Sequence, residues 1–136
     1  MNNIFPFEFA QGTVVGRDHR QAGRNNQDAS HVICSPDRSV IVAVVADGCG
    51  SGTRSGFASQ NEVGAQLGVR VFAQSVIRHL QGKTLEQAVL EDSAFWNPVR
   101  DDVSAFLRCL AHDLSDQISP LTNQYLLFTL VAAVLT

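Results

Sequence analysis

The sequence has few cysteines, and their spacing excludes the usual forms of sulfur chemistry. Cys34, Cys49 and Cys109 are an odd, widely separated set without a Cys-x-x-Cys pair. This pattern favours reduced thiols over a disulfide framework or a structural zinc site. Only four residues separate Cys49 from Arg54, one too few for the anion-binding loop of a cysteine phosphatase.

Positive charge and long apolar runs are also lacking. Ten Lys and Arg residues face thirteen Asp and Glu residues, so the net charge is −3 and no basic surface for nucleic acid is expected. Residues 1–12 have no basic start followed by a long apolar run, which a secretory signal would need. No stretch is long enough to span a membrane as a helix. We therefore expect a cytoplasmic protein that binds neither nucleic acid nor membrane.

The chain does contain the pattern of a small α+β domain. Its 136 residues, 45% of them hydrophobic, suffice for one domain with a sizeable core. Short strands are expected at residues 12–18, 28–35 and 39–47, and the turn residues 36–38 make a hairpin of the last two. The strand at 39–47 is apolar at nearly every position, which predicts burial on both faces.

Apolar residues then recur at intervals of three and four from Asn61, which predicts a helix that stops near Gly82. Thr84 is a candidate cap for a second helix. A third is expected to begin at Asn97-Pro98 and to run to about Ile118. Residues 125–136 are typical of another buried strand.

This last strand is apolar up to the final residue. A strand of this kind needs neighbours on both faces and preferably on both edges. We expect the chain to be part of a larger domain, and residues 129–135 to be able to drive association. An edge strand of a complete small domain is the alternative.

Two aspartates occupy places that predict a metal site. Asp28 begins one hairpin strand and Asp47 ends the other, so antiparallel pairing would bring their carboxylates together. Carboxylate oxygens, with a main-chain carbonyl at Gly48, suit a hard cation such as Mg²⁺ or Mn²⁺. The structural alternative is that both aspartates only cap turns.

The glycines that follow Asp47 allow a second interpretation. "GCGSG" at residues 48–52 lies between a buried strand and a helix, as in domains that bind S-adenosylmethionine or dinucleotides. Methyltransferases place an acidic residue two positions before the first glycine. Here Ala46 holds that position and Asp47 lies one residue late, which weakens this interpretation.

Other polar residues give less specific signals. His19 lies in a polar loop with Arg17, Arg20 and Arg24, where it could contact an anion. Surface solvation is expected for the acidic residues of the later helices, which are Asp101, Asp102, Asp113 and Asp116.

Taken together, "GRDHRQAGRNNQDASHV", "VAVVADGCGSG" and "NEVGAQLGVRVFAQSV" resemble the opening half of the protein phosphatase 2C family, metal-dependent serine/threonine phosphatases, and most closely a bacterial branch. The specific motifs cover residues 12–76, within a partial domain of residues 1–136. The resemblance implies a four-layer α/β/β/α sandwich of antiparallel sheets flanked by helices, about half of it in this chain. It also implies a phosphoprotein substrate.

The resemblance assigns roles to individual residues. Asp47 would bridge two Mg²⁺ or Mn²⁺ ions, the carbonyl of Gly48 would bind one of them, and Gln27-Asp28 would help to hold the second. A hydroxide between the ions would attack the phosphate. Arg24 is the candidate for binding the phosphate, and Arg17, Arg20 or His19 could serve instead.

Two departures from the family pattern affect activity. Gln27 replaces a glutamate, and the remaining metal-binding aspartates of the family come from a later segment than this chain contains. We therefore expect little phosphatase activity from the chain alone. A methyltransferase-like domain and a non-catalytic pseudophosphatase or binding module remain as alternatives.

Overall fold

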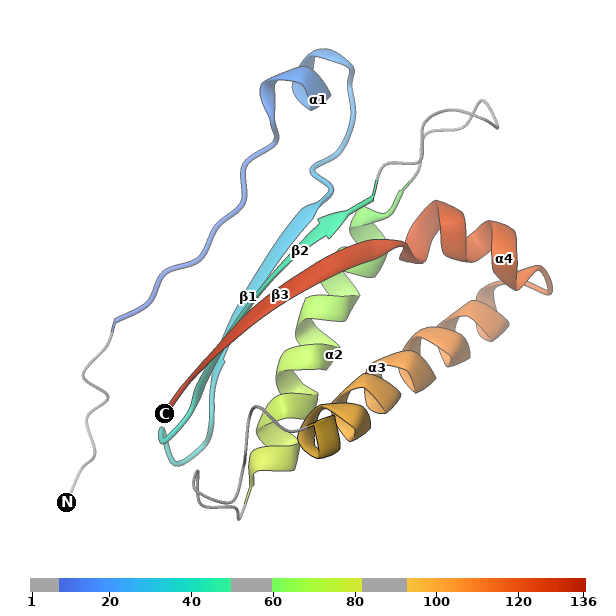
Figure 1. Cartoon of the computed structure of the whole chain (residues 1–136). Coiled ribbons are helices and arrows are strands. Elements are labelled where there is room, and N and C mark those ends of the chain that lie inside the picture. The colour runs from blue at the N-terminus through green and yellow to red at the C-terminus, as the bar shows by residue number, and fades with distance from the viewer. Residues whose placement is uncertain (1–7, 50–59, 82–92) are drawn as a thin grey trace.

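The computed structural model describes residues 8–49, 60–81 and 93–136, which form an α+β fold. The sheet has the order β1-β2-β3, and both pairs of strands are antiparallel. Helices α2 and α3 lie on the same face of this sheet (Figure 1). The elements are α1 (Arg17–Gln21), β1 (Asp28–Cys34), β2 (Ile41–Gly48), α2 (Glu62–Leu80), α3 (Ser93–Leu114), α4 (Ile118–Leu121), the π-helical turn η1 (Thr122–Leu126) and β3 (Phe128–Leu135). The described residues therefore form one sheet layer and one helix layer, which is half of the expected four-layer sandwich.

The predicted hairpin of β1 and β2 is confirmed, and its turn is stabilised by a compact group of hydrogen bonds. Asp37 accepts hydrogen bonds from the hydroxyl of Ser35 (2.5 Å) and from the main-chain N–H of Ser39 (3.1 Å). Arg38 adopts a φ of 57°, in the left-handed region that non-glycine residues seldom occupy. The hydrogen bonds that Asp37 accepts lower the pKa of its carboxyl, and the bond from the Ser35 hydroxyl contributes most. The same hydrogen bonds fix the register of the hairpin at its turn, which is the end far from Asp28 and Asp47.

Burial alternates along β2 from Val42 to Gly48, although Ile41 at its start is also buried. The prediction that this strand is buried on both faces is therefore wrong for most of its length. Val42 and Val44 are buried under α2, whereas Val45 is 55% exposed. On β3, Val131 lies opposite Val45 and is 68% exposed. A continuous apolar strand thus contributes one row to the core and another to an uncovered face of the sheet.

Small residues on α2 allow this helix to approach β3 and the turn before it very closely. A Cβ added at Gly64 would lie 2.6 Å from the main-chain oxygen of Tyr125 and 2.7 Å from the Cα of Leu126. One added at Gly68 would overlap the ring of Phe128. The two glycines therefore fix where β3 begins.

Gly64→Ala is expected to destabilise the protein although alanine is the better helix former. Helix propensity alone would stabilise the variant by about 1 kcal/mol. The new Cβ would overlap main-chain atoms that cannot rotate away, and overpacking of this kind costs about 1–3 kcal/mol. We expect a net loss of about 1–2 kcal/mol in urea unfolding. Gln66→Ala, at an exposed position on the same helix, is the control; a Gly64→Ala variant as stable as this control would contradict the close packing.

Three element boundaries differ from those predicted. Residues 12–18 do not form a strand, because α1 begins at Arg17. Helix α3 begins at Ser93, so Pro98 lies inside it rather than at its first turn. Phe95 is 6% exposed and meets the ring of Trp96 edge-on. Its burial packs the helical turn before Pro98 into the core, and this offsets the loss of the hydrogen bond that proline cannot donate. Strand β3 begins at Phe128, three residues later than predicted.

The predicted helix from Asn61 is confirmed as α2, which ends at Leu80. Gly82 and Thr84, predicted as its stop and as the next cap, lie outside the described residues. Among the described helices, none combines the length and apolarity needed to cross a membrane. The cysteines Cys34, Cys49 and Cys109 are free thiols, as predicted.

Candidate metal centre

Antiparallel pairing places two carboxylates directly opposite each other. Asp28, the first residue of β1, pairs with Asp47 near the end of β2. Asp47 in turn pairs with Thr129 of β3, so the three residues form one row across the sheet. Directly paired residues of antiparallel strands present their side chains on the same face, with Cβ atoms about 4.5–5.5 Å apart. The predicted convergence of Asp28 and Asp47 is therefore present.

This row lines an open hollow on the uncovered face of the sheet. The hollow has a volume of about 320 Å³, and its wall includes Asp28, Asp47 and Thr129 together with Thr13 from the segment before α1. Both aspartates are exposed. Two like charges held side by side destabilise a sheet by about 0.2–1 kcal/mol. A bound cation would remove that repulsion.

The end of β2 is held against the residue that precedes β1. The N–H of Gly48 donates a hydrogen bond of 3.1 Å to the main-chain oxygen of Gln27. A Cβ at Gly48 would lie 2.9 Å from that oxygen and 3.0 Å from the main-chain oxygen of Asn61. Only glycine fits here without a shift of the main chain. Gln27 itself is buried, whereas its neighbour Asp28 is exposed.

Asparagines in the loop before β1 fix the position of Asp28. Asn26 accepts a hydrogen bond from the N–H of Asp28 (3.3 Å) and donates one to the hydroxyl of Thr13 (2.7 Å). Asn25 donates to Glu62 at the start of α2 over 2.8 Å. The predicted polar loop is therefore tied both to the preceding segment and to the helix layer.

The candidate phosphate-binding residues lie in and after α1, at the end of the sheet where β1 begins and β2 ends (Figure 1). Arg24 is exposed, and its main-chain N–H donates a hydrogen bond of 2.8 Å to the main-chain oxygen of His19. Arg20 donates to the oxygen of Val15 over 3.3 Å. Among the described residues, no hydrogen bond or ion pair joins the side chains of Arg24 or His19 to the two aspartates. These basic residues thus lie at the same end of the sheet as the row but do not contact it.

The donor set fits a hard divalent cation. Asp28, Asp47 and the Gly48 carbonyl offer only oxygen, which is the ligand type preferred by Mg²⁺ and Mn²⁺. Within residues 8–49, 60–81 and 93–136 no group of three or more His, Cys, Asp or Glu side chains is placed to hold a metal ion. The described residues therefore contribute two carboxylates, with room for water or further ligands.

A sequence model of the family described as protein phosphatase 2C matches residues 15–136. The chain belongs to the protein phosphatase 2C family. Neither a curated protein nor a solved structure gives a significant match. The match includes the Asp28–Asp47 row and continues through α2, α3 and β3. Because every described pair of strands is antiparallel, the parallel doubly wound sheet of the methyltransferase alternative is not formed here.

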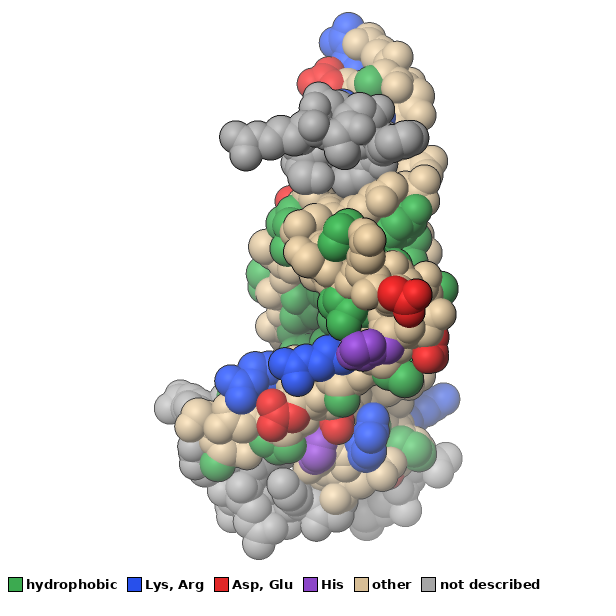
Figure 2. All heavy atoms as spheres, turned by 90° about the vertical axis from the view of Figure 1, so that its right-hand side faces the viewer, with side chains coloured by type: hydrophobic (Ala, Val, Ile, Leu, Met, Phe, Trp, Pro, Cys, Tyr) green, Lys and Arg blue, Asp and Glu red, His purple; other side chains and the backbone are tan. Residues whose placement is uncertain are grey.

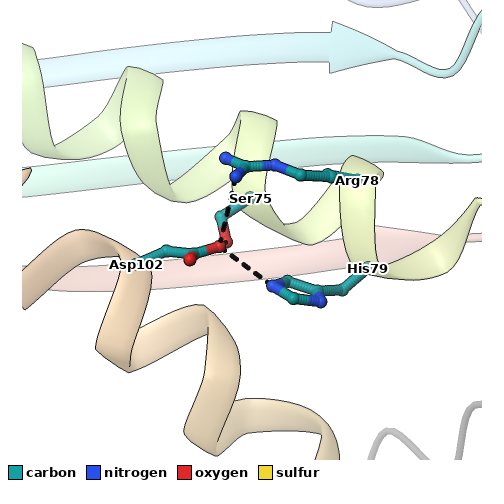
Figure 3. Close-up of polar contacts among 4 residues, drawn as sticks. All are labelled: Ser75, Arg78, His79 and Asp102. Carbon is teal, nitrogen blue, oxygen red and sulfur yellow. Dashed lines mark hydrogen bonds and ion pairs between the residues drawn. The ribbon is translucent and has the colours of Figure 1, made fainter. Parts of the chain in front are cut away.

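A second polar cluster joins α2 to α3, and sequence analysis missed it. Ser75, fully buried, donates a hydrogen bond of 2.5 Å to Oδ2 of Asp102, and Nε2 of His79 lies 2.9 Å from the same oxygen (Figure 3). Arg78 lies 3.7 Å away and is too exposed to add much. The serine contacts the carboxylate and not the imidazole, so this is not a nucleophile–base arrangement. The prediction that Asp102 is only solvated is wrong.

The other charged residues of α3 lie on an exposed surface of mixed sign. Figure 2 shows positive, negative and histidine side chains interspersed over the helix-covered side of the molecule. Asp101 and Asp113 of α3 are exposed, as is Asp116 after it, in agreement with the predicted solvation.

Removing the Asp102 carboxylate should change how the stability of the protein depends on pH. The hydrogen bonds from Ser75 and His79 lower the pKa of the Asp102 carboxyl below its ordinary value. A carboxyl of this kind stabilises the fold above its unfolded pKa of about 3.9, and the stabilisation is lost as the pH falls below that value. Asp102→Asn should therefore lower the melting temperature more at pH 7 than at pH 3. Asp113→Asn is the control, and equal losses for Asp102→Asn at both pH values would contradict the assignment.

Proposed function

We propose that this protein is a metal-dependent phosphoprotein phosphatase domain that acts on phosphoserine or phosphothreonine. Asp47, the Gly48 carbonyl and Asp28 would hold Mg²⁺ or Mn²⁺, with Gln27 beside them. The observation that carries the proposal is the direct pairing of Asp28 with Asp47 inside a chain of the protein phosphatase 2C family. A purely structural role would leave two repelling carboxylates uncompensated on one face of the sheet.

Different residues would bind the metal ions and the phosphate group. When bound, the metal ions would lower the pKa of water and offset the negative charge of the phosphate. Asp28 and Asp47 would hold that centre at the open end of the sheet, where a protein substrate can reach it. Arg24 or His19 would grip the phosphate, because a guanidinium matches phosphate oxygens with two parallel hydrogen bonds. This role is supported by α1, which contains His19 and precedes Arg24, because it lies at the end of the sheet where β1 begins (Figure 1).

Calorimetric titration with Mn²⁺ tests this proposal, with S-adenosylmethionine as the competing ligand. We expect heat from Mn²⁺ and none from S-adenosylmethionine. Because the described residues supply only two carboxylates, hydrolysis of p-nitrophenyl phosphate by this chain alone should be slow. Fast, Mn²⁺-dependent hydrolysis would contradict that expectation, and a lack of any response to Mn²⁺ would favour a non-catalytic pseudophosphatase or binding module.

A further inference from the structure

Asn61 is the most fully buried amide side chain near the candidate metal centre, with an exposed fraction of 0%. It directly precedes α2, and at such a position an asparagine side chain usually caps the helix. Here the side chain makes no capping hydrogen bond. Its polar atoms instead reach two other segments of the chain, which indicates a different role.

The hydrogen bonds of Asn61 close a ring with the ends of two strands. Its Nδ2 donates to the main-chain oxygen of Cys49 (2.5 Å), and its Oδ1 accepts from the N–H of Leu127 (3.1 Å). The N–H of Cys49 donates to the oxygen of Leu127 over 2.9 Å. Both main-chain polar groups of Cys49 and both of Leu127 are therefore engaged. A further bond of 3.3 Å from Nδ2 to the oxygen of Asn123 ties the ring to η1.

This ring lies next to the residues assigned to the metal. Cys49 directly follows Gly48, and Leu127 directly precedes Phe128, which pairs with Gly48 across β2 and β3. The main-chain oxygen of Asn61 also lies 3.0 Å from where a Gly48 Cβ would be. The main chain is thus held at Cys49 and at Leu127, next to Gly48 and close to Asp47, which lines the hollow.

We propose that Asn61 is a positioning residue that fixes the Asp47-Gly48 turn for cation binding. This inference rests on the proposed function. The amide suits this role because one side chain must donate to a carbonyl and accept from an N–H at the same time. Groups that orient metal ligands without touching the metal commonly contribute 10- to 100-fold in affinity.

Mn²⁺ affinity of the full chain, measured by calorimetry below the unfolding temperature, tests the role of Asn61. We expect Asn61→Ala to raise the Mn²⁺ dissociation constant about 10-fold or more. Ser75→Ala is the matched control, because it also removes a buried hydrogen bond from the α2 layer but lies away from the turn. It should lose stability and keep the wild-type dissociation constant. An Asn61→Ala variant that is destabilised but binds Mn²⁺ like the wild type would overturn the inference.

A second measurement needs no variant and applies even if Asn61→Ala fails to fold. Coupling between the ring and the cation must be reciprocal, so saturating Mg²⁺ should slow hydrogen exchange at the Leu127 amide, which donates to Asn61. The His79 amide, inside α2, should show no comparable slowing. Unchanged exchange at Leu127 with Mg²⁺ bound would overturn the inference and leave the proposed function standing. Failure of the wild type to bind either ion would overturn both.

Discussion

Replacing Asp47 with asparagine is expected to raise the melting temperature of the metal-free protein and to abolish its response to Mn²⁺. Without metal, the substitution removes the repulsion from the directly opposite Asp28, a gain of about 0.2–1 kcal/mol or about 1–4 °C. With metal, it removes a ligand, and the affinity should fall about 100-fold or more, since even indirect partners contribute up to that much. The two effects have opposite signs, which a purely structural aspartate would not produce.

Thermal melting with and without Mn²⁺ measures both effects in one experiment. Asp101→Asn makes the same change of charge at an exposed position of α3, where its contact with Arg100 contributes little. This control should melt like the wild type and keep the Mn²⁺-dependent rise. If Asp47→Asn instead lowers the melting temperature without metal, the carboxylate is stabilising the turn and the metal assignment loses its main support.

Gly48→Ala is expected to damage stability and metal binding together. The new Cβ would lie 2.9 Å from the oxygen of Gln27 and 3.0 Å from that of Asn61, both main-chain atoms. Relieving these contacts requires the ends of β1 and β2 to separate, which costs about 1–3 kcal/mol and weakens the Gly48–Gln27 hydrogen bond. Because Asp47 moves with the turn, Mn²⁺ affinity should fall about 10-fold. Urea unfolding and calorimetry measure the two losses.

Gly16→Ala provides the matched control for this variant. A Cβ at Gly16 would meet no atom within 4 Å, and its φ of −56° suits any residue. The control should therefore retain the wild-type stability and Mn²⁺ affinity. If Gly48→Ala is as stable as this control, the turn can accommodate a Cβ, and the predicted overlap with the main chain is wrong.

The part of the site that depends on local pattern could be predicted from the sequence. Two apolar runs joined by Pro36–Arg38 specify a hairpin, and a hairpin places the start of its first strand beside the end of its second. The proximity of Asp28 and Asp47 follows from this, whereas their direct pairing also depends on the register that the turn sets. The apolar repeat from Asn61 likewise specified α2, because its period is that of a helix over five turns.

The parts that depend on tertiary contacts could not be predicted. Asn61 looks like an ordinary helix cap until the chain folds and brings Cys49 and Leu127 to it. Pro98 resembles a helix start, and only the packing of Phe95 and Trp96 moves that start to Ser93. The apolar run of β2 is equally compatible with one covered face or two, since the cover comes from other elements. Each of these outcomes depends on contacts with elements that are distant in sequence.

A double-mutant cycle of Mn²⁺ binding tests most directly the claim that Asp28 and Asp47 hold one cation together. The dissociation constants of the wild type, Asp28→Asn, Asp47→Asn and the double variant would be measured by calorimetry and by the electron paramagnetic resonance of free Mn²⁺. If both carboxylates bind the same ion, each single variant loses affinity and the double variant loses much less than the sum of the two free-energy changes. Wild-type affinity in all three variants would contradict the account, because the paired aspartates would then hold no metal.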